Sequence, residues 1–136
     1  MEKALHYKAE IQAIPLIRRD LEELAVAWSL PGPERRQILL IVEELFSNTI
    51  RFAFKDTEEH YVRILIALKD HHIYMEMIDD GIPFNPMEYN PTYRPDPAAV
   101  DDGGMGLTLI KAFADSIEYS RKEERNHLVI RKIIRQ

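Results

Sequence analysis

Glu44 and Asn48 form the first pair of residues in this sequence whose types and spacing could do chemistry. They stand four positions apart in 34-ERRQILLIVEELFSNTIRFAF-54, a stretch with helical periodicity. Its core stripe consists of Ile38, Ile41, Val42, Leu45, Phe46 and Thr49. At about 100° per residue, Glu44 and Asn48 lie together on one flank of that stripe. The carboxylate could accept a proton and the amide oxygen could ligate Mg²⁺, although such a pair also fits a solvated helix flank.

A second candidate follows in 78-IDDGIPFNP-86. Asp79 and Asp80 end a predicted strand, where side chains leave the sheet, and Gly81 comes next. Glycine has no Cβ, so another group can approach the backbone closely there. Carboxylates in this place could bind a ligand, and an ordinary acidic turn is the other interpretation.

The third candidate is the glycine-rich stretch 103-GGMGLTLIKAFAD-115. Three of the five glycines in the sequence lie in its first four residues, and an amphipathic helix is predicted to follow. Each of the three signals is weak alone. Their order along the chain, from the Glu-x-x-x-Asn helix to the Asp-x-Gly strand end and then the glycine-rich loop, is more specific.

The predicted elements that position these residues alternate between strand and helix. Residues 4–14 have the alternation of a strand, and a first helix begins at Pro15 and runs to Trp28. The second helix follows the break at 30–33, and a hairpin is predicted over 61–81 with its turn at 69–72. Residues 82–102 hold five of the eight prolines and are predicted to be a long loop. A closing hairpin over 117–134 completes an α+β pattern.

Composition limits the possible classes of protein. A chain of 136 residues with 46% hydrophobic residues is expected to form one domain, residues 1–136, with an ordinary core. The absence of cysteine excludes disulfides and thiol chemistry and fits a reducing cytoplasm. No membrane segment or signal peptide is predicted, so we expect a soluble protein. The net charge of -5 argues against direct binding to nucleic acid.

In the order of these motifs the sequence resembles the GHKL (Bergerat-fold) ATPase superfamily, and within it the small anti-sigma-factor serine kinases of bacteria. The stretch 43-EELFSN-48 is similar to the N box, 79-DDGIPF-84 to the first glycine box and 103-GGMGLTLI-110 to the second. The resemblance covers nearly the whole chain. It implies a two-layer α/β sandwich, with a mixed, mostly antiparallel sheet, helices on one face, and an ATP lid at about residues 84–102.

The resemblance also implies a role for each motif. Asn48 would ligate the Mg²⁺ that bridges the phosphates of ATP, and Asp79 would accept a hydrogen bond from the adenine amino group. Gly81 would let the base approach the backbone. The residues implied to bind ATP in the second glycine box are Gly104, Met105, Gly106 and Leu107, with Gly104 and Gly106 bending the chain around the phosphates. Glu44 would act as the general base.

The activity implied is that of an Mg²⁺-ATP-dependent protein serine kinase. Such kinases bind a sigma factor and phosphorylate an anti-anti-sigma antagonist of the STAS type, and a homodimer is possible by the same resemblance. The first alternative is a non-catalytic interaction module that keeps the nucleotide-binding fold. The second is an ATPase component of a larger complex.

Overall fold

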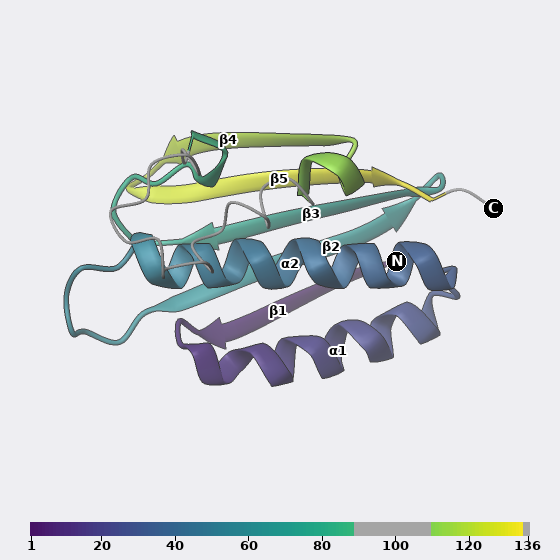
Figure 1. Cartoon of the computed structure of the whole chain (residues 1–136), viewed down its shortest axis with the longest axis horizontal. Helices are drawn as coiled ribbons and strands as arrows, with labels where there is room; N and C mark the ends of the chain where they lie inside the picture. The colour runs from purple at the N-terminus through teal and green to yellow at the C-terminus, as the bar shows by residue number, and fades with distance from the viewer. Residues whose placement is uncertain (89–109, 135–136) are drawn as a thin grey trace, which may run out of the picture.

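The computed structural model describes residues 1–88 and 110–134 of the chain (Figure 1). These residues form one sheet and two long helices. The strands are β1 (Glu2–Lys8), β2 (Tyr61–Lys69), β3 (His72–Asp79), β4 (Ser116–Lys122) and β5 (Arg125–Ile133), and the helices are α1 (Ile14–Ala27) and α2 (Gly32–Phe52). Short 3₁₀ turns lie at Ile11–Ala13 and Pro86–Glu88, and residues 110–113 form one helical turn. The predicted α+β class is confirmed.

The sheet has the strand order β1-β2-β3-β5-β4. All of these neighbouring pairs are antiparallel, so the sheet that was predicted to be mixed and mostly antiparallel is antiparallel throughout the described strands. The reason for the β1–β2 pair is that two helices separate the strands. The chain reverses three times, on entering α1, on entering α2 and on entering β2, so β2 runs against the direction of β1 (Figure 1). Tight hairpins join β2 to β3 and β4 to β5.

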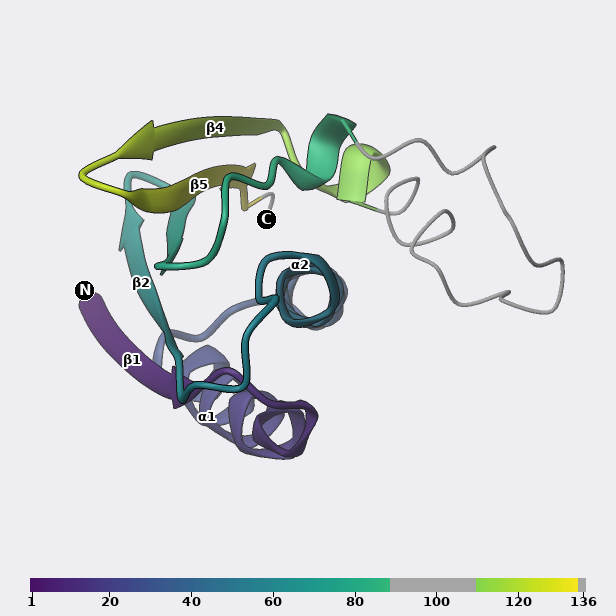
Figure 2. The same cartoon turned by 90° about the vertical axis from the view of Figure 1, so that its left-hand side faces the viewer.

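Both helices cover the same face of the sheet, which gives two layers (Figure 2). Pro15 lies in the first turn of α1, where its missing N–H costs no helical hydrogen bond, and Pro31 precedes the first residue of α2. The predicted core stripe of α2 is buried without exception, from Ile38 to Thr49. Neither described helix is apolar enough over a sufficient length to span a bilayer.

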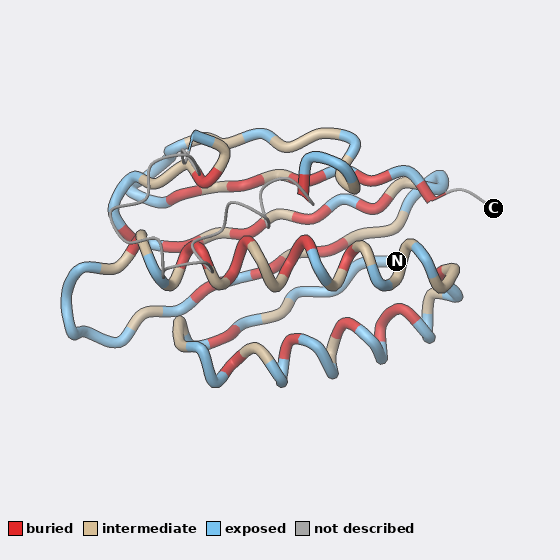
Figure 3. The backbone as a smooth tube through the Cα atoms, viewed as in Figure 1, coloured by how far each residue is buried: buried red, intermediate tan, exposed pale blue. Residues whose placement is uncertain are grey.

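Burial alternates along the central strands, as their period of two requires (Figure 3). On β3 the buried side chains are Ile73, Met75, Met77 and Asp79, and on β5 the row comprises Asn126, Leu128, Ile130 and Lys132. These rows face α1 and α2. The β3 row ends in the polar Asp79, and the β5 row has polar residues at both ends, Asn126 and Lys132. Asp79 and Asn126 are direct partners in the sheet register.

Both hairpins turn through two residues with positive φ. The values are 52° at Asp70 and 62° at His71, and 51° at Glu123 and 63° at Glu124. Type I′ turns require this backbone conformation, which Asn and Gly adopt at low cost and glutamate does not. The β4–β5 turn is thus strained by its sequence.

We expect replacement of Glu123-Glu124 by Asn-Gly to stabilise the protein by about 1 kcal/mol, because the new residues adopt positive φ more easily. The free energy of unfolding in urea measures the effect. A Gln-Gln variant is the control, since it removes both charges and retains the unfavourable side chains. Equal stabilisation by the two variants would show that charge repulsion, rather than backbone strain, is relieved.

Candidate functional site

The candidate site lies where the end of α2 meets the chain that leaves β3. The amide of Ile82 donates a hydrogen bond to the carbonyl of Ala53 over 2.8 Å. The rings of Phe52 and Phe84 lie 5.5 Å apart between centroids. The end of α2, just after the predicted N box, is therefore in contact with the predicted first glycine box, about thirty residues further along the chain.

Asp79 is the best-defined polar residue of this site. It is only 5% exposed. Its Oδ1 accepts hydrogen bonds from the amide of Gly81 and from Nδ2 of Asn126, both over 2.9 Å. No described residue donates to its other oxygen, Oδ2. Burial raises the pKa of this carboxyl above its ordinary value, and the two hydrogen bonds oppose that change. Oδ2 is thus the oxygen that can accept a hydrogen bond from a ligand.

Gly81 is required by a close approach of two backbone segments. A Cβ at this position would lie 2.5 Å from the carbonyl oxygen of Ala53 and 2.9 Å from Oδ1 of Asp79. The sequence predicted a close approach to the backbone here, and in the described residues the approaching group is the end of α2. Approach of an adenine base stays a prediction.

The structure distinguishes the two neighbouring glutamates of the N box. Glu43 forms an ion pair with Arg18 of α1, with 2.8 Å between Oε1 and Nε. Glu44 is partly exposed, and no described residue forms a hydrogen bond or an ion pair with it. Glu43 therefore links the two helices, while the carboxylate of Glu44 is available for a ligand.

Asn48 is buried at 4% exposure, although the sequence placed it with Glu44 on a flank of the helix. It follows the fully buried Leu45 and Phe46 and precedes Thr49, which is 1% exposed. An exposed flank is thus excluded for Asn48. Ligation of a metal by its side chain stays a prediction.

Part of the predicted site lies outside the described residues. This part comprises the residues of the second glycine box, Gly104, Met105, Gly106 and Leu107, and most of the lid predicted at 84–102. Within the described residues, the lid segment begins with a 3₁₀ turn at Pro86–Glu88. Ile110, the last residue of the second glycine box, is 1% exposed and belongs to the core.

Asn126 is a site residue that the sequence did not predict. Its side chain contacts Asp79, and it also accepts hydrogen bonds from Tyr119 and Arg121 of β4. Arg121 donates a second hydrogen bond, over 2.7 Å, to the carbonyl of Gly81. The one signal in the sequence was an asparagine in phase with the apolar residues Leu128 and Ile130, which implies a buried amide with specific partners.

His60 holds the loop between α2 and β2 against the predicted adenine-binding turn. Its Nε2 lies 2.7 Å from Oδ1 of Asp56, and its Nδ1 lies 3.0 Å from Oδ1 of Asp80. The ring also stacks on Phe54 at 4.5 Å. The hydrogen bond with Asp56 raises the pKa of His60 above 6.5, and Asp80 adds to this effect. An imidazolium can donate hydrogen bonds to both carboxylates at once, so the two bonds from His60 to Asp56 and Asp80 require the protonated ring.

We expect the stability that His60 contributes to be complete below pH 6.5 and to be lost as the pH rises through its higher folded-state pKa. Stability should fall as the pH rises, because the folded state favours the protonated form of His60. Melting temperatures of the wild type and His60→Gln, measured from pH 5.5 to pH 8.5, test the prediction. The two curves should lie furthest apart at low pH. His71→Gln, in an exposed turn, is the control and should leave the pH profile unchanged.

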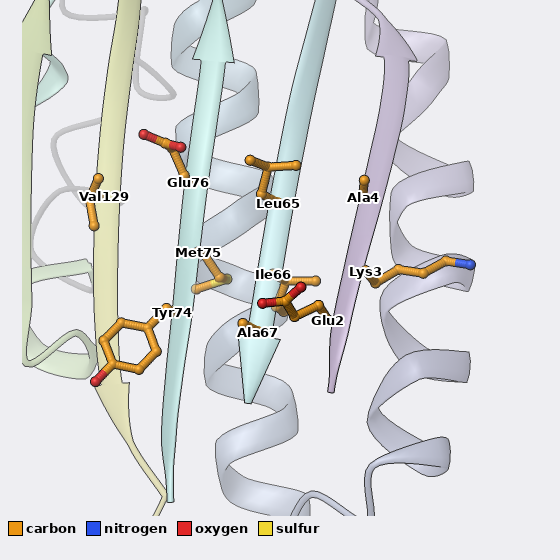
Figure 4. Close-up of a pocket in the computed structure, with 10 residues that line it drawn as sticks. All are labelled: Glu2, Lys3, Ala4, Leu65, Ile66, Ala67, Tyr74, Met75, Glu76 and Val129. Carbon is orange, nitrogen blue, oxygen red and sulfur yellow. The ribbon is translucent and has the colours of Figure 1, made fainter. Parts of the chain in front are cut away.

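A hollow of about 530 Å³ lies on the face of the sheet opposite the helices. Its lining includes Ala4, Leu65, Ala67, Tyr74 and Val129, which come from β1, β2, β3 and β5 (Figure 4). It contains none of the residues predicted to bind ATP. The hollow is therefore distinct from the candidate site.

Comparison with known proteins gives a consistent result. The family model for the histidine kinase-like ATPase domain matches residues 7–132. The anti-sigma F factor of Bacillus subtilis is 28% identical over 93 residues, which cover 67% of this chain and 63% of that protein. The anti-sigma F factor of Clostridium beijerinckii is 30% identical over 104 residues, or 73% of this chain and 71% of that protein. The chain thus spans less than two thirds of the length of the Bacillus relative.

Solved structures show the same fold. The structure of the RsbU and RsbW domains of Rv1364c from Mycobacterium tuberculosis matches with a TM-score of 0.68 and 15% identity, over 97% of this chain and 32% of that chain. The histidine kinase domain of the blue-light activated kinase from Erythrobacter litoralis EL346 matches with a TM-score of 0.57 and 18% identity, over 76% of this chain and 46% of that chain. At these identities the likeness shows the fold alone.

Proposed function

This chain belongs to the histidine kinase-like ATPase family, and from that premise we propose that it is an Mg²⁺-ATP-dependent protein serine kinase that acts as an anti-sigma factor. We propose further that it works in the cytoplasm, where it binds a sigma factor and phosphorylates an anti-anti-sigma antagonist of the STAS type. The similarity to anti-sigma F factors supports the regulatory part of this proposal.

The single observation that carries nucleotide binding is the geometry of Asp79. Two donors hold one oxygen of this buried carboxylate, and no described residue donates a hydrogen bond to the other oxygen. An ionised carboxylate only accepts hydrogen bonds, so it suits the exocyclic amino group of adenine. Guanine presents a carbonyl oxygen at the same ring position, which Asp79 would repel.

The residues of α2 supply the chemistry of the proposed reaction. Asn48 would hold Mg²⁺ through its amide oxygen, and the ion, when bound, would offset the charge of the phosphates. Glu44 would orient the serine hydroxyl of the antagonist and take its proton. The serine oxygen would form the new bond to the γ-phosphorus while the bond to the leaving ADP breaks.

Phosphorylation would regulate the exchange of partners. The unmodified antagonist would capture the kinase and so release the sigma factor, and the phosphorylated antagonist would dissociate. One phosphate would thereby couple two binding equilibria. The alternative, a non-catalytic module with the same fold, would keep the binding equilibria without phosphotransfer.

A thermal melt tests nucleotide binding directly. The protein is heated with ATP and Mg²⁺, with ATP and EDTA, and with GTP and Mg²⁺. A ligand at about a hundredfold excess over its Kd stabilises the fold by about 2.7 kcal/mol, which raises Tm by several degrees. We expect this shift only with ATP and Mg²⁺ together. Asp79→Asn should lose the shift, and the matched change Asp80→Asn, on the exposed neighbouring carboxylate, should retain it.

The outcomes of the melt separate the alternatives. A shift with GTP equal to that with ATP would contradict the role of Asp79, and a shift that survives EDTA would contradict the role of Asn48. Absence of any shift at saturating nucleotide would overturn the kinase proposal. The non-catalytic module would then be the better explanation of the fold.

A further inference from the structure

A buried polar pair, Asp79 and Asn126, lies at the ends of two neighbouring buried rows of the sheet, next to the proposed nucleotide site. Asp79 and Asn126 are direct partners in the antiparallel pairing of β3 with β5. They are 5% and 2% exposed, respectively. Burial of a polar side chain lowers the stability of the fold unless the side chain is fully hydrogen-bonded. The hydrogen bonds of Asn126 should therefore indicate the role of the pair.

The amide nitrogen of Asn126 faces two acceptors. It donates to Oδ1 of Asp79 over 2.9 Å and to the carbonyl of Ile82 over 2.8 Å. Both hydrogens of the amide are therefore used. One of these bonds goes to the carboxylate at the end of β3, and the other goes to the chain just beyond it.

The amide oxygen of Asn126 faces three donors. These are the hydroxyl of Tyr119 at 2.6 Å, Nη1 of Arg121 at 3.1 Å and the backbone amide of Phe84 at 3.2 Å. A flipped amide would set its NH₂ group against the N–H of Phe84 and the guanidinium of Arg121, and would set its oxygen against a carboxylate and a carbonyl. The surroundings thus allow only one orientation of the side chain.

We propose that Asn126 is the positioning residue that sets the adenine specificity of this site, because it occupies Oδ1 of Asp79 and leaves for the base Oδ2, to which no described residue donates. This inference rests on the proposed function. Asn126 also holds the chain at Ile82 and Phe84 in place beside that acceptor. It contacts no ligand itself, and its effect passes through Asp79.

The chemistry predicts for which nucleotides the binding affinity depends on Asn126. A fixed carboxylate oxygen strengthens binding of a purine with a 6-amino group and weakens binding of a purine with a 6-oxo group. Without the bond from Asn126, the carboxylate of Asp79 can rotate or take up a proton, and a protonated carboxyl donates as well as accepts. Loss of Asn126 should therefore reduce the contribution of the 6-amino group to binding affinity, rather than lower the affinity for all nucleotides equally.

The test measures the Kd of the full chain for ATP and for the triphosphate of purine riboside, which lacks only the 6-amino group, both with Mg²⁺. A hydrogen bond to a charged group makes the wild type prefer ATP by about 10-fold to 100-fold. In Asn126→Leu, which has nearly the same shape and no side-chain donor, we expect this preference to fall to about 3-fold or less. Tyr119→Phe is the matched control, because it removes a neighbour of Asn126 and keeps the bond to Asp79; its preference should match the wild type.

The outcomes distinguish this inference from the proposed function. If the wild type binds neither nucleotide, the proposed function fails and the role of Asn126 fails with it. If the wild type prefers ATP and the Asn126 variant keeps the same preference, only the role of Asn126 is overturned, since a merely structural residue would weaken both ligands alike. Should Asn126→Leu fail to fold, the shorter Asn126→Ala, which also has no side-chain donor, replaces it and has the same expected loss of preference.

Discussion

Glu44→Gln is expected to abolish phosphorylation of a protein antagonist while ATP binding remains close to that of the wild type. Glutamine keeps the size and polarity of the side chain and cannot take the proton of the attacking hydroxyl. Removal of a general base typically lowers the rate by about 10²-fold to 10⁴-fold. The measurement is transfer of the γ-phosphate from labelled ATP to an antagonist of the anti-anti-sigma type, together with the Kd for ATP.

The matched control is Glu43→Gln, one residue away on the same helix. Glu43 contributes an ion pair with Arg18 whose cation is about half exposed, so its loss should change stability little and leave the rate of transfer nearly unchanged. The opposite result, with Glu43→Gln inactive and Glu44→Gln active, would show that the general base was assigned to the wrong glutamate.

Gly81→Ala is expected to have the second large effect, because a single methyl group has no room at this position. The new Cβ would lie 2.5 Å from the carbonyl oxygen of Ala53 and 2.7 Å from its Cβ. Relief of the clash must move the turn away from α2 and shift Asp79, whose Oδ1 accepts a hydrogen bond from the Gly81 amide. We expect a loss of about 1–3 kcal/mol in the free energy of unfolding, and ATP affinity at least about tenfold lower.

Gly32→Ala provides the control for this substitution. At the start of α2 an added Cβ would meet only Nη1 of Arg36, at an ordinary contact distance of 3.5 Å. This variant should be neutral or slightly stabilised, since alanine is the better helix former. Urea unfolding and nucleotide titration on both variants measure the two effects. Equal stability and equal affinity of Gly81→Ala and the wild type would contradict the packing of the turn against α2.

Local regularities let the sequence predict most of the elements. The core stripe of α2 recurs at helical spacing, and every member of it is buried. The hairpin predicted over 61–81, with its turn at 69–72, is confirmed by β2 and β3. These predictions succeeded because side-chain direction follows from the period of the backbone, which depends on neighbours along the chain. The same periodicity, with the order of the motifs, indicated the family that comparison then showed.

Relations between segments far apart in sequence were decided only by the tertiary structure. The period of β5 predicts that Asn126 faces the same side as Leu128, but only the register of β3 against β5 places it opposite Asp79. Likewise, the sequence offers two adjacent glutamates, and the packing of α1 on α2 assigns Glu43 to Arg18 and leaves Glu44 open. The physical reason is that a hydrogen bond or an ion pair needs two groups within about 3 Å of each other, and that distance is set by how strands and helices pack. The sequence by itself therefore determined the fold class and the motifs. The tertiary structure determined which residues from other segments contact the motif residues and which motif residues have no such contact.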